Sequence, residues 1–286
     1  MPTDYTEDFF EYHRDGARRS AQEIVPLVID LVQPRSAIDV GCGSGSWLAV
    51  FKEYGILDVL GVDGSYIDSS VLEIPEDQFL AHDLRKPLEI DRQFDLVVSV
   101  EVAEHIPQEY AEIYINSLAR LGPIVLFSAA IPLQGGTNHL NEQWPEYWVE
   151  HFEHRGYVIV DAIRKSVWQN DNIAVWYAQN VILFVRRDYL EDNLRLLKEL
   201  ENTNRSQLSI IHPKLFIEVA EKNKLHKEKA EFYIAEAEQL KADAHIHRQK
   251  IESYSAEVEQ LKAEVQTHKA KAESYIAEVE RLTAEH

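Results

Sequence analysis

Hydrophobic and polar residues change their spacing repeatedly along the first two thirds of the chain. Apolar residues recur at helical spacing over residues 17–32, 46–54, 108–121 and 145–155. Short, mainly apolar runs lie between or beside these segments: Ser36–Val40, Asp58–Val62, Phe79–Ala81, Phe94–Val100, Ile124–Ala129, Tyr157–Val160 and Val181–Val185. Such runs, when they alternate with helices, are typical of buried parallel strands covered by helices on both faces of a sheet.

The last two apolar runs are joined in a different way. The segment between them holds Val167-Trp168-Gln169-Asn170-Asp171-Asn172, which is too short for a well-formed crossover helix. Because parallel neighbours need a long crossover connection, an antiparallel last strand is expected. The pattern as a whole predicts an α/β fold with a Rossmann-like, doubly wound, mostly parallel sheet of seven strands and an antiparallel last strand.

The final seventy residues carry a sequence repeat. Tyr233, Tyr254 and Tyr275 stand in similar surroundings at intervals of 21 residues, which is three heptads. With these tyrosines at heptad position d, the other d positions are His226, Leu240, His247, Leu261, His268 and Leu282, and the a positions are Ala230, Ala237, Ala244, Ile251, Val258, Val265, Ala272 and Val279. Sustained heptads without glycine or proline predict a coiled coil. The histidine layers and the bulky tyrosines favour a parallel homotrimer over a dimer.

These changes of pattern divide the chain into four parts. We expect an N-terminal helical lid over residues 1–35, an α/β core over 36–187, a helical linker over 188–216 and a coiled coil over 217–286. The first part is rich in aromatic residues, namely Tyr5, Phe9, Phe10 and Tyr12, which suits a segment that closes over a site.

Composition limits the classes of binding partner and the cellular location that are expected for the protein. The formal net charge of −20 argues against a nucleic-acid partner, because lysine and arginine supply most of the affinity for phosphate backbones. The single cysteine, Cys42, excludes an intramolecular disulfide and a cysteine-based zinc cluster. No apolar run is long enough for a transmembrane segment, and the N-terminus lacks the pattern of a signal peptide. A cytoplasmic location is therefore expected.

The turn after the first predicted strand is rich in glycine. It reads Asp39-Val40-Gly41-Cys42-Gly43-Ser44-Gly45-Ser46, and glycines at alternate positions let the backbone bend sharply and approach a ligand. Ser46 replaces the third glycine of the dinucleotide fingerprint, which weakens the case for NAD. Asp63 follows the second strand and is suited to a ribose diol, and Asp83 follows the third and could bind an adenine amino group.

In these features residues 36–186 resemble the class I S-adenosylmethionine-dependent methyltransferases. The resemblance implies that Gly41 and Gly43 pass the methionine part of the cofactor, that Asp63 holds its ribose, and that Asp83 and Leu84 meet its adenine. The remaining cofactor candidates at the same strand ends are Asp39, Gly64 and Val100. The alternative interpretation is a nucleotide-binding or degenerate Rossmann-like domain.

The fourth strand leads directly into Glu101-Val-Ala-Glu104-His105. One helical turn would place Glu101, Glu104 and His105 on a common face, and buried carboxylates need a compensating charge. The pattern resembles two metal-dependent groups of O-methyltransferases, which act on small-RNA 3′ ends and in the ubiquinone pathway. There a histidine after strand five completes the ligand set, and His139 is the candidate here. The resemblance implies a divalent cation such as Mg²⁺ or Mn²⁺. Without a metal, Glu101 would line the cofactor pocket, and His105 or His139 would be the catalytic base.

The acceptor is suggested only by composition and architecture. Aromatic residues are numerous near the expected site, and a sugar with adjacent hydroxyls could occupy two positions on a cation. An enzyme joined to a long coiled coil resembles enzymes that cap bacterial surface polysaccharides, so an O-methyltransferase acting on a sugar or glycan is the preferred function. The alternatives are a small-molecule, quinone or catechol O-methyltransferase, and a coiled-coil scaffold whose domain binds cofactor without activity.

Overall fold

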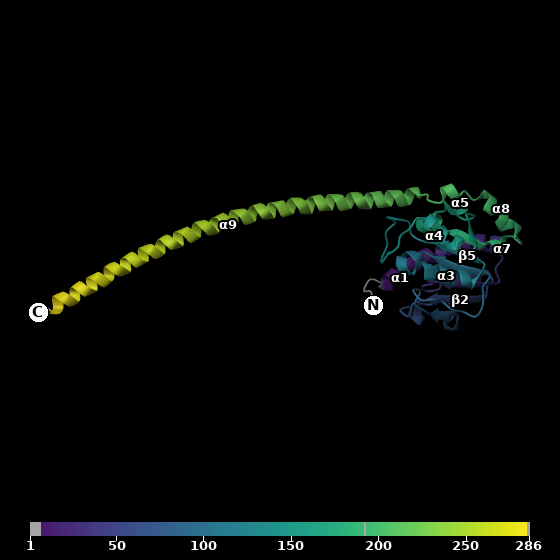
Figure 1. Ribbon diagram of the computed structural model, residues 1–286, viewed down its shortest axis with the longest axis horizontal. Helices are drawn as coiled ribbons and strands as arrows, with labels where there is room; N and C mark the ends of the chain where they lie inside the picture. Colours follow the sequence, from purple (N-terminus) through teal and green to yellow (C-terminus); the bar gives the residue numbers. More distant parts are fainter. Residues whose placement is uncertain (1–6, 192, 285–286) are drawn as a thin grey trace. The chain divides into compact units, whose positions relative to one another are not determined.

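A computed structural model describes the backbone of residues 7–191 and 193–284 and the side chains from Gly16 onward within those ranges (Figure 1). Tyr5 and the other residues of the predicted lid up to position 6 lie outside the described residues, as do the side chains of Phe9, Phe10 and Tyr12. The backbone of the predicted lid is helical from Glu7, because α1 spans Glu7–Val32 without a break.

Seven strands form one mixed sheet, as the sequence predicts. They are β1 (Ser36–Val40), β2 (Asp58–Asp63), β3 (Phe79–Ala81), β4 (Leu96–Val100), β5 (Ile124–Ser128), β6 (Tyr157–Val160) and β7 (Ile182–Arg186). Their order across the sheet is β3-β2-β1-β4-β5-β7-β6. All pairs are parallel except those of β7, which is antiparallel to both β5 and β6. The predicted antiparallel last strand is therefore confirmed.

Four helices of the α/β part lie where apolar spacing predicts them, whereas the two short helices between β6 and β7 were not predicted. Besides α1, the helices of this part are α2 (Ser46–Glu53), α3 (Ala111–Leu121), α4 (Pro145–Glu153), α5 (Arg164–Val167), α6 (Val175–Asn180), α7 (Arg187–Leu190) and α8 (Leu194–Asn202). The helix expected from residue 108 starts with a short 3-10 turn, Gln108–Tyr110, before α3 begins. Strand β4 starts two residues late, because the amide of Phe94 donates to Leu121 and that of Asp95 donates to the Ser36 hydroxyl.

Two hydrophobic clusters cover the two faces of the sheet. Successive residues of β4 alternate between them, since Leu96 and Val98 belong to one cluster and Val97 to the other. The first cluster takes its helical residues mainly from α1, α2 and α6, and the second takes them from α3 and α4. Both faces are thus buried, which explains why the strands read as continuous apolar runs.

The chain divides into two compact units, one ending at Val219 and one beginning at Ala220. The second unit consists of most of α9, which runs from Pro213 to Ala284 as a single uninterrupted helix (Figure 1). The long helix that the heptads predict is therefore present, and its apolar a and d side chains are exposed, including Ile251, Tyr254 and Leu261. Among the described residues, no helix is both long and apolar enough to cross a membrane.

Candidate active site

The carboxyl ends of β1, β2, β4 and β5 meet at one edge of the sheet, where open α/β sheets bind their ligands. The glycine loop leaves β1 with Gly41, Gly43 and Gly45 in the left-handed region, at φ values of 89°, 53° and 83°. The amide of Gly41 donates to the carbonyl of Val62, which folds the loop over the end of β2. A Cβ atom at Gly41 would overlap the side chain of Val102, so only glycine fits there.

Asp63, at the end of β2, is hydrogen-bonded to the glycine loop. Its buried carboxylate accepts hydrogen bonds from the Gly43 amide at 2.7 Å, the Gly64 amide at 2.6 Å and the Tyr66 hydroxyl at 2.5 Å. Burial raises the pKa of Asp63, while these three hydrogen bonds favour the charged form. The ring of Tyr66 lies against Gly64, where a Cβ atom would overlap it. Asp63 is therefore fixed in position by the chain itself.

Asp39 lies in β1 next to this loop and is also buried. Its Oδ2 atom has no hydrogen-bond partner among the described residues. Burial first, and then the charge of Asp63, raise the pKa of Asp39 well above its usual value. A buried carboxylate oxygen of this kind is suited to a ligand that brings a positive charge or an N–H or O–H donor.

Asp83, which the resemblance assigns to the adenine, is hydrogen-bonded to a neighbouring side chain. Both of its oxygens accept hydrogen bonds from Arg85, at 2.8 and 3.0 Å. These hydrogen bonds are the main reason that the pKa of Asp83 falls to about 2. Leu84 packs partly buried against the second hydrophobic cluster, and Val100 is buried in the first. The binding of an adenine amino group by Asp83 stays a prediction, and its partly exposed carboxylate has lone pairs left to accept one.

Glu101 follows β4 in a left-handed conformation, with φ at 54°. Its Oε2 accepts from the Gln134 amide at 2.9 Å and its Oε1 from the Asn180 amide at 3.1 Å. Its backbone amide donates to the Ser128 hydroxyl at 2.9 Å. Burial raises the pKa of Glu101, and these side-chain hydrogen bonds oppose that rise. Glu101 thus connects β4, the loop after β5, and α6.

Glu104 has a buried carboxylate without a hydrogen-bond partner. Its side chain is fully buried, and neither Oε1 nor Oε2 has a partner among the described residues. The amides of Glu104 and Ala130 favour its charged form, yet neither makes a hydrogen bond of good geometry with it. Burial first, and then the charge of Glu101, raise the pKa of Glu104 well above its usual value. Two unpaired oxygens in a buried site are expected to bind a cation or a strong donor.

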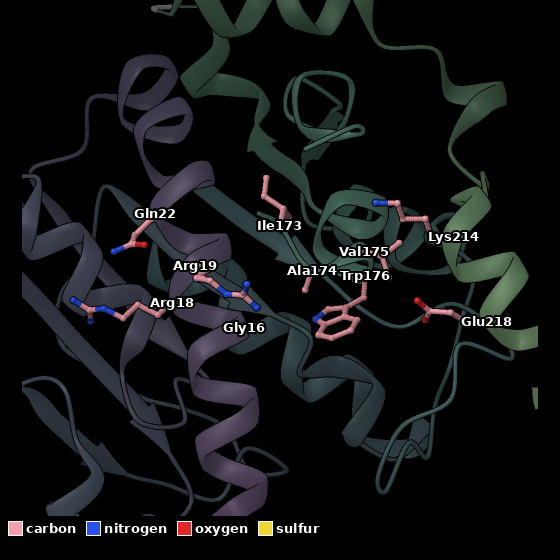
Figure 2. Close-up of a pocket in the computed structure, with 10 residues that line it drawn as sticks. All are labelled: Gly16, Arg18, Arg19, Gln22, Ile173, Ala174, Val175, Trp176, Lys214 and Glu218. Atoms are coloured by element: carbon pink, nitrogen blue, oxygen red, sulfur yellow. The ribbon is translucent and has the colours of Figure 1, made fainter. Parts of the chain in front are cut away.

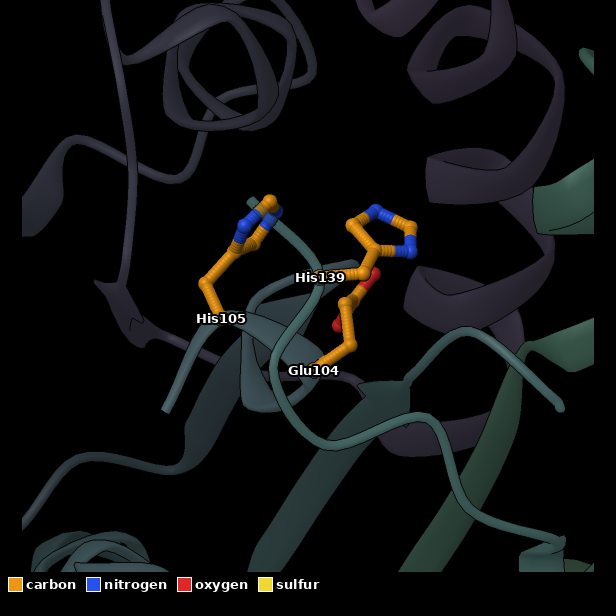
Figure 3. Close-up of side chains that lie close together, drawn as sticks. All are labelled: Glu104, His105 and His139. Carbon is orange, nitrogen blue, oxygen red and sulfur yellow. The ribbon is translucent and has the colours of Figure 1, made fainter. Parts of the chain in front are cut away.

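Two histidines lie beside Glu104, as Figure 3 shows. One potential ligand atom each from Glu104, His105 and His139 lies within 4.8 Å of the others. The rings of His105 and His139 meet edge to face, with centroids 4.9 Å apart. A 3-10 turn over Ala103–His105 turns Glu104 and His105 toward this point. A carboxylate with two imidazoles fits a divalent cation.

The loop after β5 brings His139 to this cluster. The amides of Leu140 and Asn141 both donate to the carbonyl of Glu104, which attaches the loop to the turn after β4. The Nδ1 atom of His139 lies 2.9 Å from Oε1 of Glu142. Glu142 also accepts from the amides of Leu133 and Gly135, each at 2.8 Å. Glu142 therefore orients the imidazole and holds the loop closed around it.

Three of the four predicted metal ligands come together in this way. The fourth, Glu101, binds Gln134 and Asn180 instead of joining the group. The helical spacing that would align it holds only from Ala103, because Glu101 has a left-handed backbone conformation. Glu101 remains close enough for a protonated His139 to lower its pKa. It is thus a neighbour of the cluster, with its oxygens directed to amides.

Comparison with models of protein families shows which family the chain belongs to. A family model described as a methyltransferase domain matches residues 10–172, which is more than half of the chain. The chain belongs to this family of methyltransferase domains. The prediction of a class I methyltransferase is confirmed at the level of family and fold, since the sheet is the α/β methyltransferase fold. No curated protein is similar enough to the chain to count as a match.

Solved structures share this fold at low sequence identity. The methyltransferase is 15% identical to a sugar N-methyltransferase, KedS8, from Streptoalloteichus sp ATCC 53650, with a TM-score of 0.50 over 64% of this chain and 93% of that one. It is 12% identical to an amino pentose methyltransferase, CalS10, from Micromonospora echinaspora, with a TM-score of 0.47 over 65% and 99%. It is 20% identical to magnesium protoporphyrin IX methyltransferase from Synechocystis PCC 6803, with a TM-score of 0.47 over 64% and 86%.

Several residues of the methyltransferase site are not evident from sequence motifs. Glu73 accepts a hydrogen bond from Ser44 at 3.2 Å and another from Ser46, and its amide donates to the Ser44 carbonyl, so it supports the glycine loop. Arg18 of α1 in turn contacts Glu73 at 2.5 Å. The other site residues that sequence motifs do not reveal are Tyr66, Gln134, Glu142 and Asn180. The spacing of Glu142 three residues after His139 was a local signal for an ion pair, but the remaining contacts are long-range.

Proposed function

We propose that this protein is an S-adenosylmethionine-dependent O-methyltransferase that is assisted by a divalent cation and acts on a hydroxyl group of a sugar. The observation that carries the proposal is the cluster of Glu104, His105 and His139, with its buried carboxylate lacking any partner in the described chain. The family match supports methyl transfer as the reaction.

The residues at the ends of β1 and β2 fit the proposed methyl donor. The glycine loop exposes backbone where side chains would obstruct a ligand, and the unpaired oxygen of Asp39 suits a donor group such as an ammonium. Asp63 is already oriented by three hydrogen bonds and can accept further ones from a diol. S-adenosylmethionine would supply an activated methyl group, so the chain mainly has to align the acceptor and remove a proton.

The residues after β4 and β5 fit the proposed cation. Glu104, His105 and His139 would hold it, with Glu101 close by as a further carboxylate, and Mg²⁺ or Mn²⁺ are the candidates. A divalent cation supplies Lewis acidity, which lowers the pKa of a hydroxyl group. The Glu142 carboxylate can only accept, so in neutral His139 the N–H group at Nδ1 would donate the hydrogen bond to it and Nε2 would keep its lone pair. If no cation binds, that Nε2 atom would instead accept the proton of the acceptor hydroxyl.

A second acceptor class is favoured by one observation. Leu133, Leu140 and Trp144 lie on the loop that carries His139, and they are 76%, 63% and 38% exposed. Exposed apolar side chains beside a catalytic cluster suit an aromatic acceptor such as a catechol or a quinone. A sugar remains the preferred acceptor, because its adjacent hydroxyl groups could occupy two positions on the proposed cation.

Turnover tests these proposals directly. Labelled S-adenosylmethionine should be incubated with panels of sugars and catechols, with and without exhaustive chelation, followed by addition of Mg²⁺, Mn²⁺ or Co²⁺. We expect methylated sugar, loss of activity on chelation, and recovery on addition of metal. Full activity after chelation would remove the cation from the proposal and leave a histidine base. Methylation of catechols alone would favour the second acceptor class.

We also propose that α9 assembles copies of the chain into a parallel trimer. Its a and d side chains are exposed from Ala230 to Leu282, and isolated long helices gain their stability mainly by burying such a stripe. A chain that ends at Val219 should stay folded, because the first unit ends there, and should have a smaller oligomeric state. Light scattering of both chains checks this. A full-length monomer at micromolar concentration would rule out the trimer, and an unchanged state after truncation would assign assembly to the α/β unit.

A further inference from the structure

A pocket of about 730 Å³ lies beside the candidate active site, within the first unit. Its walls come from three segments that are distant in sequence, as Figure 2 shows. Helix α1 contributes the face of Arg18, Arg19 and Gln22, the segment from Ile173 to Trp176 forms the opposite wall, and the first turns of α9 add Lys214 and Glu218. The proposed function uses none of this volume.

The polar groups of the pocket are largely balanced in charge. Arg18 pairs with Glu53 and Glu73, and Lys214 pairs with Asp171. Glu218 adds a carboxylate to the wall itself. The pocket therefore lacks the surplus of positive charge that a phosphate or another strongly anionic group would require. It presents hydrogen-bonding groups of both kinds: guanidinium and ammonium donors, an amide and a carboxylate acceptor.

Trp176 gives the pocket an aromatic surface. Its side chain is only partly buried and lies on the pocket wall, with its indole directed toward α1 and Arg19 in Figure 2. An indole face combined with planar polar side chains suits a pyranose ring, which has apolar C–H faces and a rim of hydroxyl groups. A flat, fully apolar ligand would cover polar side chains of this wall, such as Gln22 and Glu218, without offering them a hydrogen bond.

Both walls are attached to the candidate active site. Trp176 belongs to α6, and so does Asn180, which donates to Glu101. Arg18 contacts Glu73, which supports the glycine loop through Ser44 and Ser46. A chain-like ligand in the pocket would thus lie next to the elements that hold the methyl donor and the acceptor hydroxyl.

We propose that this pocket is a second saccharide subsite, which binds sugar units adjacent to the one that is methylated. The proposal rests on the sugar O-methyltransferase proposed above and makes its substrate more specific: an oligosaccharide or polysaccharide is favoured over a free monosaccharide. The ligand class is a neutral glycan, because Arg18 and Lys214 are paired with carboxylates and the wall has no surplus of positive charge.

Acceptors of increasing length test the subsite. The full-length enzyme should be assayed with methyl glycosides of glucose, mannose, galactose and rhamnose and with linear tetrasaccharides of the same sugars. We expect the KM for a tetrasaccharide to be lower than that for its methyl glycoside by at least ~10-fold, the factor that corresponds to about 1.4 kcal/mol. Equal KM values for short and long acceptors would overturn the proposal.

Variants locate the effect in the pocket. Trp176→Ala should raise the tetrasaccharide KM by ~10-fold, while the methyl glycoside KM and the affinity for S-adenosylmethionine stay unchanged. Gln22→Ala should also raise the tetrasaccharide KM, by a smaller factor. Because Gln22 is exposed on α1, this variant should fold normally and so tests the pocket even if Trp176→Ala is misfolded. Tyr54→Ala, at an exposed aromatic residue outside the pocket, is the matched control and should change nothing. A proportional rise for short and long acceptors in Trp176→Ala would contradict a subsite.

A direct measurement of tetrasaccharide binding tests the subsite independently of the proposed methylation. If no sugar is methylated, the proposed function fails, and calorimetry with the four tetrasaccharides still decides about the pocket. Binding to the full-length protein that Trp176→Ala abolishes would support the subsite. Binding that the variant leaves intact, or no binding of any tetrasaccharide, would overturn it.

Discussion

Asp63 and Glu104 are both buried carboxylates at the same edge of the sheet, yet their surroundings differ completely. Asp63 receives three hydrogen bonds, two from backbone amides and one from Tyr66. Glu104 receives none from the described residues. The described residues therefore stabilise the charge of Asp63, whereas they leave the charged form of Glu104 unfavourable and raise its pKa.

This difference distinguishes the proposed cofactor site from the proposed cation site. At the end of β2 the carboxylate of Asp63 is already oriented by the backbone, so little free energy is needed to order it when a ligand binds. At the end of β4 the proposed cation would supply the compensating charge, so its binding would also stabilise the folded protein. The comparison predicts that substitutions at the two carboxylates have opposite effects on the stability of the ligand-free protein.

The largest effect is expected from Glu104→Gln. If the carboxylate holds the cation, the substitution removes a ligand, and methyl transfer should fall by more than ~100-fold. It also removes a buried charge that has no partner among the described residues. The ligand-free protein should become more stable, by about 1 to 3 kcal/mol. Activity assays with added Mn²⁺ and chemical unfolding of the metal-free protein measure the two effects. Glu109→Gln, at an exposed position nearby, is the matched control. Retained metal-dependent activity would exclude Glu104 as a ligand.

Asp63→Ala should have the opposite effect on stability. The amides of Gly43 and Gly64 would lose their acceptor, and the ligand-free protein should be less stable by about 1 to 3 kcal/mol. The affinity for S-adenosylmethionine should fall by about 1.5 to 3 kcal/mol, the range for hydrogen bonds to a charged group. Calorimetry measures the affinity, with Asp77→Ala as an exposed control. An unchanged affinity would remove Asp63 from the cofactor site.

Glu142→Gln sharpens the comparison on the cation side. The substitution keeps the shape of the side chain but removes the charge that orients His139 through Nδ1. Residues that orient a metal ligand typically affect metal affinity by 10- to 100-fold, so binding of Mn²⁺ should weaken by ~10-fold. Titration of Mn²⁺ followed by electron paramagnetic resonance measures it directly. Glu150→Gln on the exposed side of α4 should bind as the wild type does. Equal affinities in the two variants would assign Glu142 to loop structure only.

The contrast between the two carboxylates also shows how far sequence reasoning reaches. The strands could be predicted because both faces of the sheet are buried, and the glycine loop because only glycine tolerates the contact with Val102. The local pattern around Glu104 and His105 suggested a ligand set with His139, and these three side chains do lie close together, while metal binding stays a prediction. Adjacent residues and strand ends are what a sequence specifies most directly.

The surroundings of Glu101 could not be predicted in this way. Its partners, Gln134 and Asn180, are 33 and 79 residues away and come from a loop and from α6. Its left-handed backbone conformation also breaks the helical spacing that aligned it with Glu104 in the sequence. Side-chain amides at distant positions have no characteristic pattern, and only the tertiary structure brings them to one carboxylate.

The smallest expected effect concerns Asp39, the third buried carboxylate at this edge. Its folded-state pKa is raised by burial and by Asp63, so folding favours the protonated form. The contribution to stability is fully present below the ordinary pKa near 3.9 and is lost as pH rises through the raised value. Asp39→Asn should therefore be more stable than the wild type at neutral pH, by about 1 kcal/mol, and this advantage should disappear as pH falls toward 4.

Unfolding by urea between pH 4 and pH 8 measures this advantage. Asp91→Asn removes the same charge at an exposed position and corrects for the general effect of the net charge of −20. Saturating S-adenosylmethionine should stabilise the wild type more than Asp39→Asn, because the unpaired oxygen would then have a partner. If Asp39→Asn were no more stable than the wild type at neutral pH, and the cofactor stabilised both proteins equally, Asp39 would be paired in solution and would behave like Asp63.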